Sequence, residues 1–205
     1  MARSFKAAPL PMDELLPVSA PGDIPRALRG TPFARLLEYH NLGARPGPHK
    51  GAELLVCMCM DNRELLRLPE NFAYVLRAGG GNVRHNEFNV SCAVAIGGVR
   101  HIALIANDGS CMVNLSARRR AFISGLVEGA GWSPVEAMAH FNDNEHRFEI
   151  GNEINFVVSE SRRLGLKYPR IKVVPLFYRI ADGKLYLLRG GRPRTAGPAN
   201  RRAPR

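Results

Sequence analysis

Four residues have side chains whose types and spacing could perform chemistry together. Cys59, Asp61 and Arg63 alternate at the end of one apolar run, and Cys111 follows later in the chain. A thiolate can bind a soft divalent metal ion, and a nearby carboxylate can bind the same ion or be held back by an arginine. The pattern therefore predicts a metal site in which Arg63 controls whether Asp61 reaches the metal.

Three apolar segments place these side chains at one edge of a predicted sheet. Each segment is short and almost wholly apolar, which is typical of parallel strands covered on both faces: 53–59, 72–76 and 99–106. Sites in parallel sheets lie beyond the carboxyl ends of the strands. Cys59, Arg77 and the pair Asn107-Asp108 fall at such ends, so we expect one shared site.

Helix signals lie between and after these segments. Thr31-Pro32 and Ser133-Pro134 each pair a capping side chain with a proline at the first helical position. Helices are predicted from Thr31 to Asn41, from Asn86 or Asn89 to Ile96, over 116–128, from Ser133 onward and over 152–164. A strand pair, 171–180 and 184–188, closes the chain around Asp182-Gly183. The alternation predicts an α/β fold with a mainly parallel β-sheet flanked by helices.

Composition restricts the class of protein. The chain has 205 residues, 45% of them hydrophobic and 23% charged, which is ordinary for one folded domain with extensions. No apolar run approaches the roughly 20 residues of a membrane-spanning helix, and residues 1–22 lack the apolar stretch of a secretory signal. Four cysteines at this length do not make the framework of a small secreted domain. We therefore expect a cytoplasmic protein with reduced thiols.

The chain divides into three predicted parts. Residues 1–50 form a proline-punctuated arm and helix, 51–188 form the α/β domain, and 189–205 form a basic tail without acids. That tail carries part of the formal charge of +11 and has too little apolar surface to fold alone. We expect it to be disordered, either simply solvated or available to an anionic partner such as nucleic acid, an acidic protein or a lipid surface.

Several motifs occur in an order that resembles the β-class carbonic anhydrases. Besides the Cys-x-Asp-x-Arg motif and Cys111, the resemblance rests on Arg77–Gly81, Gly98–Ile102, Trp132–Pro134 and Phe177–Leu185. It covers the chain from about Glu53 to Leu188. The family implies a zinc ion held by two cysteines and one histidine, and the hydration of carbon dioxide to bicarbonate.

Carried onto this sequence, the resemblance assigns roles to particular residues. Cys59 and Cys111 would be the thiolate ligands, Asp61 and Arg63 the catalytic dyad, and the turn at Gly79-Gly80 would border the substrate. The family also implies a homodimer or higher oligomer, with the N-terminal arm and first helix wrapped around a partner subunit. The apolar side chains of that helix, which would be unfavourable if left in water, agree with this expectation: Leu36, Leu37 and Tyr39.

One departure from the family bears on the metal. The family pattern is Gly-His-x-x-Cys, whereas this chain reads Ala106-Asn107-Asp108-Gly109-Ser110-Cys111. Counting forward from the strand places Asn107 at the histidine, and counting back from Cys111 places Asp108 there, as if one residue were inserted. A carboxylate is an acceptable zinc ligand and an amide oxygen a poor one. The expected ligand set is therefore Cys59, Asp108 and Cys111. With Asn107 in that position instead, the two thiolates alone would make a weak metal site.

The ligand set decides between three functions. A carboxylate in place of imidazole makes the zinc complex more negative, so its bound water should be less acidic and hydration slower. The protein is then an anhydrase with altered or reduced activity, or a zinc hydrolase of a related heterocumulene such as carbonyl sulfide or carbon disulfide. The third alternative is a catalytically silent relative that serves as a binding or assembly subunit. Cys57 and Cys92 are expected to pack as small apolar side chains.

Overall fold

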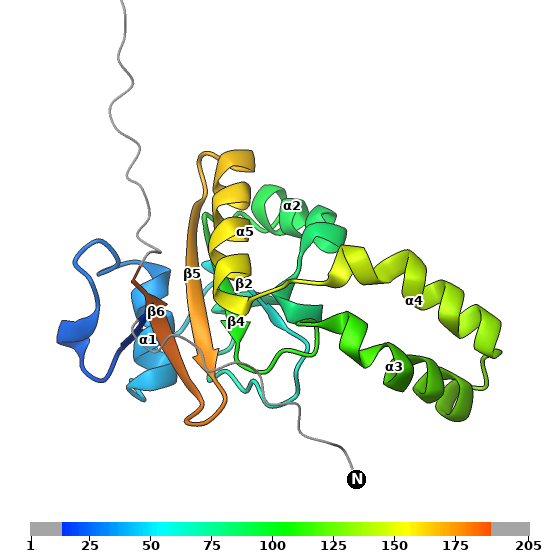
Figure 1. The fold of residues 1–205 in the computed structure, drawn as a ribbon. Coiled ribbons are helices and arrows are strands. Elements are labelled where there is room, and N and C mark those ends of the chain that lie inside the picture. The colour runs from blue at the N-terminus through cyan, green and yellow to red at the C-terminus, as the bar shows by residue number, and fades with distance from the viewer. Residues whose placement is uncertain (1–13, 190–205) are drawn as a thin grey trace, which may run out of the picture.

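The computed structural model describes residues 14–189, which form one mixed sheet with helices on both faces (Figure 1). The elements are β1 (Leu15–Pro17), α1 (Pro32–Asn41), β2 (Leu54–Cys59), β3 (Ala73–Ala78), α2 (Glu87–Ala95), β4 (His101–Asn107), α3 (Leu115–Ala130), α4 (Pro134–Phe148), α5 (Glu153–Lys167), β5 (Lys172–Arg179) and β6 (Lys184–Leu188). The predicted α/β class and each predicted helix and strand are confirmed, with ends shifted by a few residues. No helix in this part of the chain is long and apolar enough to cross a membrane.

The sheet has the strand order β1-β6-β5-β4-β2-β3. The four strands from β5 to β3 are parallel, and β6 and β1 add antiparallel pairs at one edge. The carboxyl ends of β2, β3 and β4 therefore meet at one edge of the sheet, as the site requires. Sequence reasoning missed β1, because three residues in a proline-rich segment carry almost no periodic signal.

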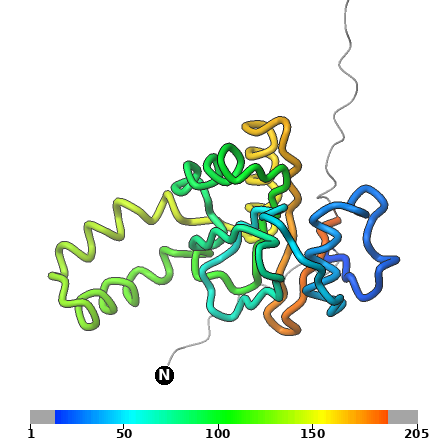
Figure 2. Tube along the Cα trace, turned by 180° about the vertical axis from the view of Figure 1, so that it is seen from behind, coloured from blue at the N-terminus to red at the C-terminus, as the bar shows by residue number. Residues whose placement is uncertain are grey.

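Apolar side chains alternate between the two faces of each central strand. Leu54, Val56 and Met58 of β2 point to the face covered by α1, whereas Leu55 and Cys57 point to the face covered by α2 and α5. All six β2 side chains are buried, which explains the unbroken apolar run in the sequence. Figure 2 shows from behind the helices that cover the two faces of the sheet.

Helix α1 packs within the core of its own chain. Leu36 and Leu37 are fully buried in this chain's own core beside Phe33, and Tyr39 packs partly against the same cluster. Strand β1 also pairs with β6 of the same sheet. Residues 14–50 thus contribute buried side chains to the core of the sheet, and the contact of this arm with a partner subunit stays a prediction. The tail, beyond Arg189, lies outside the described residues.

Helices α3 and α4 form a hairpin that projects away from the sheet (Figures 1 and 2). Gly131, with φ of +74°, ends α3 in the left-handed conformation that glycine favours. Ser133 then opens α4 with a capping box, since its side chain accepts from the Glu136 backbone N–H while Glu136 reaches back. The sequence signals at Ser133-Pro134 therefore mark the start of α4, directly after the short connection from α3.

Candidate functional site

Cys59 is the last residue of β2 and lies at the site edge of the sheet. Its side chain is 1% exposed, and its Sγ accepts a hydrogen bond from the backbone N–H of Gly80 at 3.2 Å. Burial raises the pKa of the Cys59 thiol, and the neighbouring backbone N–H groups oppose that rise. Cys59 is therefore buried, with its Sγ held against the glycine turn.

Asp61 and Arg63 form the expected ion pair just beyond β2. Arg63 Nε donates to Asp61 Oδ1 at 2.9 Å, and the Arg63 backbone N–H donates to the same oxygen at 2.9 Å. The hydrogen bonds from Arg63 lower the pKa of the Asp61 carboxyl despite some opposing burial. Arg63 Nη2 also donates to the carbonyl of Gly109 at 3.3 Å, so the pair is tied to the loop after β4.

Asn107 ends β4 and faces this pair. Its side chain is 1% exposed, and Nδ2 donates to Asp61 Oδ2 at 3.3 Å and to the Asp108 carbonyl at 3.3 Å. Its Oδ1 is buried and has no hydrogen-bond partner. An orphaned buried acceptor is unfavourable, so the arrangement leaves one polar atom available to a donor.

Of the two residues expected to complete the metal site, Asp108 is engaged by another part of the chain. Asp108 Oδ1 accepts a hydrogen bond from the Ile180 backbone N–H at 2.6 Å, which directs this carboxylate toward the end of β5. Cys111 is exposed. Ser110, which sequence reasoning passed over, is instead 2% exposed, and its Oγ accepts from the Met112 backbone N–H at 3.3 Å. The inward side chains of this loop are thus Asn107 and Ser110.

These donors do not fit a zinc ion. Zinc in proteins takes three or four ligands from thiolate, imidazole and carboxylate groups. Within residues 14–189, no three His, Cys, Asp or Glu side chains lie close enough together to hold a metal ion. The amide of Asn107 and the hydroxyl of Ser110 are weak ligands for zinc beside a thiol. The structure brings together Cys59, Asp61, Arg63 and Asn107, but does not assemble the set of Cys59, Asp108 and Cys111.

The glycine turn (Gly79–Gly81) packs tightly against the segments that lead into and out of the helical hairpin. A Cβ on Gly79 would lie 2.8 Å from Met112 Cε, and one on Gly80 would lie 2.9 Å from Ile150 Cδ1. The absence of a Cβ at Gly79 and Gly80 therefore lets other groups come close to the turn backbone, as expected. The groups that do so are side chains of this chain and not a substrate. Met112 and Ile150 fill the space over the turn.

Arg77 braces the loop that carries the dyad. Its Nη1 donates to the Cys59 carbonyl at 3.0 Å, and its Nη2 donates to the Glu64 carbonyl at 2.8 Å. The Glu64 carboxyl is fully buried, and neither of its oxygens has a hydrogen-bond partner. Burial raises the pKa of this carboxyl to about 8. Sequence reasoning missed Glu64, because a glutamate after Arg63 looks like an ordinary surface residue.

The remaining cysteines and histidines supply no replacement ligand. Cys57 is buried in the core, where burial raises its pKa to about 12, in agreement with its expected packing role. His85 stacks near Phe148, with ring centroids 4.7 Å apart, and contacts Arg147. His101 packs edge-on against Phe33.

Comparison with known proteins gives similarity in structure alone. No protein-family model and no curated protein matches the sequence. The β-carbonic anhydrase isoform I of Trichomonas vaginalis is 15% identical, with a TM-score of 0.57 over 73% of this chain and 90% of that one. A carbonic anhydrase from Glaciozyma antarctica is 21% identical, with a TM-score of 0.53 over 79% and 98%. The apo form of a carbon disulfide hydrolase is 15% identical, with a TM-score of 0.50 over 68% and 80%. The chain therefore has a β-carbonic-anhydrase-like fold, as the sequence motifs predicted.

Proposed function

We propose that this chain is a β-carbonic-anhydrase-like protein that does not hydrate carbon dioxide through zinc and serves instead as a binding or assembly subunit. The observation that carries the proposal is the direction of the side chains after β4. Asn107 and Ser110 are buried, whereas Asp108 accepts a hydrogen bond from the Ile180 backbone N–H and Cys111 is exposed. A site with one thiol, one amide, one hydroxyl and a carboxylate that Arg63 holds lacks the ligands that zinc requires.

The spacing of these inward residues supports the same proposal. The family pattern Gly-His-x-x-Cys fits Ala106–Ser110 without an inserted residue, so that Asn107 stands at the histidine and Ser110 at the second cysteine. On this alignment, two of the three implied ligands are replaced, and Cys111 is one residue beyond the ligand position. The burial of Asn107 and Ser110 favours this count over the one that requires an insertion.

The residues that remain still form a polar site for a small ligand. Asp61 stays ionised beside Arg63, and Asn107 holds its amide against Asp61 while its Oδ1 lacks a partner. A small molecule with a hydrogen-bond donor suits that oxygen, whereas bicarbonate would meet the carboxylate of Asp61 unless Arg63 shifts toward it. Four free cysteines among the described residues suit a reducing compartment such as the cytoplasm.

A second candidate function is retained because the Asp61–Arg63 pair and Cys59 keep the expected arrangement. It is zinc-dependent hydration of carbon dioxide, or hydrolysis of carbonyl sulfide or carbon disulfide, with Cys59, Asp108 and Cys111 as ligands. This function requires Asp108 to leave the Ile180 N–H and Cys111 to turn inward.

Two variants distinguish the candidates by opposite results. The double substitution Asn107→His with Ser110→Cys builds a Cys-His-Cys set at the inward positions and should bind about one zinc per chain. Asp108→His builds a set only if Asp108 and Cys111 are the ligand positions, so on our proposal it should bind none. Zinc content by mass spectrometry and carbon dioxide hydration by stopped flow are measured on both variants and the wild type. A wild type that binds zinc stoichiometrically, together with activity gained in Asp108→His, would overturn the proposal.

A further inference from the structure

A hollow of about 420 Å³ lies where α2 and α5 end, on the face of the sheet that these two helices cover (Figure 1). It is bounded by the last residues of α2, by Arg100 ahead of β4 and by residues 167–171, which lead from α5 into β5. Strand β4 runs from this hollow toward the Cys59 site, and its seven residues place the two roughly 20 Å apart. The volume is within the range of sites that take small organic molecules. The hollow is therefore a second candidate site, separate from the first.

The hollow carries positive charge. Within residues 14–189, the charged side chains that line it are all basic, namely Arg100, Lys167 and Arg170. Lys167 pairs with the carboxylate of Glu87, but that carboxylate also pairs with Arg163 at 2.8 Å, so Glu87 alone does not neutralise the hollow. The carboxyl-terminal ends of α2 and α5 each add about half a negative charge, which the three bases exceed. An anion is therefore the kind of ligand that this hollow attracts.

Two of the three bases have N–H donors available to such a ligand. Arg100 Nη1 donates to the carbonyl of Val94 at 3.1 Å and to that of Val99 at 2.9 Å, which fixes the position of its guanidinium group. Its Nε and Nη2 donate to no other group in the part of the chain that the structure describes. Arg170 is exposed and has no hydrogen bond or ion pair within that part. A guanidinium group with free donors matches the oxygens of a phosphate group.

The rest of the lining is mainly apolar and includes one aromatic ring. The hydroxyl of Tyr168 is hydrogen-bonded to the hydroxyl of Ser91 at 2.8 Å, which anchors the ring between α5 and α2. Val94, Pro169 and Ile171 line the hollow beside it. Aromatic side chains bind other flat rings by stacking, and nucleobases are rings of this kind. The lining thus suits a molecule that joins an anionic group to a flat ring.

We propose that this hollow binds a mononucleotide, with the phosphate at Arg100 and Arg170 and the base against Tyr168. An inorganic anion alone would leave the ring and the apolar lining in water. An uncharged ring alone would leave both guanidinium groups without an anion. The inference goes beyond the proposed function, because it depends on no residue of the Cys59 site.

Isothermal titration calorimetry on the full chain at low salt tests the proposal with three probes. Adenosine monophosphate carries both groups, adenosine carries only the ring system with its sugar, and inorganic phosphate carries only the anion. We expect adenosine monophosphate to bind at least about tenfold more tightly than either of the other two. Inorganic phosphate or adenosine that binds as tightly as adenosine monophosphate would overturn the proposal, and so would the absence of binding by all three.

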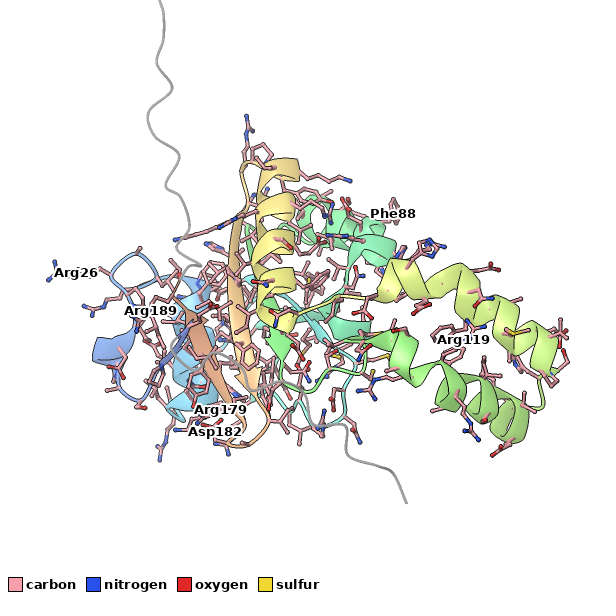
Figure 3. The ribbon with its side chains drawn as sticks, viewed as in Figure 1. Arg26, Phe88, Arg119, Arg179, Asp182 and Arg189 are labelled. Atoms are coloured by element: carbon pink, nitrogen blue, oxygen red, sulfur yellow. The ribbon has the colours of Figure 1, made fainter. Side chains whose placement is uncertain are left out.

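Substitution of the two arginines locates the binding. Arg170→Gln should raise the dissociation constant of adenosine monophosphate about tenfold without loss of structure, because Arg170 has no partner within residues 14–189. Arg100→Gln should do the same, and circular dichroism reports whether the end of α2 remains helical without the bond to Val94. Arg26→Gln is the matched control, because Arg26 is exposed on the segment between β1 and α1 (Figure 3) and should leave the constant unchanged. Wild-type affinity in Arg170→Gln, or an equal loss in Arg26→Gln, would contradict the proposal.

Discussion

The glycine turn beside Cys59 allows a quantitative test of the site geometry. Gly80 has a φ of +62°, and an alanine Cβ at this position would lie 2.9 Å from Ile150 Cδ1 and 3.1 Å from Met112 Cβ. Left-handed backbone costs a residue with a Cβ roughly 1–2 kcal/mol, and overpacking of a filled interior costs roughly 1–3 kcal/mol. We therefore expect Gly80→Ala to lower the free energy of unfolding by about 2–5 kcal/mol.

Gly98 provides the matched control for the backbone contribution. Its φ is +71°, but no atom lies within 4 Å of the Cβ position, so Gly98→Ala should lose only the backbone part, about 1–2 kcal/mol. Urea denaturation followed by circular dichroism measures both variants. Ile150→Val in the Gly80→Ala background should recover part of the loss, because it removes the methyl group that the new Cβ meets.

The result that would refute the reasoning is an equal loss in the two alanine variants. Equal losses would mean that Met112 and Ile150 do not fill the space over Gly80. The turn would then be open to a ligand, and the packed site described above would be incorrect.

Three further predictions follow from buried groups. Leu36→Ala in α1 should cost about 2–5 kcal/mol of stability at any protein concentration, because Leu36 is fully buried within its own chain; a loss that disappears on dilution would favour a partner interface instead. The Glu64 carboxyl has a pKa of about 8 in the folded state against 4.5 in the unfolded state, so the unfolded state releases the proton at lower pH. The free energy of unfolding should therefore fall as pH rises from about 4.5 to 8. Glu64→Gln should flatten that part of the pH profile in urea titrations, and an unchanged profile would count against the buried carboxyl. Glu160 is fully buried between Arg84 and Arg163, so Glu160→Ala should cost about 3–5 kcal/mol in thermal or urea unfolding, whereas loss of the exposed Glu128 should have no measurable effect.

Much of the fold could be predicted from the sequence because local signals agreed with the tertiary structure. The unbroken apolar run at β2 reflects burial of both faces, and the Ser133-Pro134 signal became a capping box. The position of α1 could not be predicted, because an apolar face specifies burial and not which surface covers it. In the structure, Leu36 and Leu37 pack against the sheet of their own chain.

The site was predictable in part for a similar reason. The ends of parallel strands converge by topology, so Cys59, Asp61, Arg63 and Asn107 could be placed together before any coordinates were known. The side-chain directions in the loop after β4 depend on contacts that are distant in sequence. Asp108 turns toward Ile180, seventy-two residues away, and this contact leaves Asn107 and Ser110 as the inward pair.

A crystal structure of the wild-type chain grown with zinc, with anomalous data at the zinc edge, tests the central claim most directly. The account predicts no peak near Cys59 and an Asp108 carboxylate that still accepts the Ile180 N–H. A peak bound by Cys59, Asp108 and Cys111, with zinc–sulfur distances of about 2.3 Å, would contradict it.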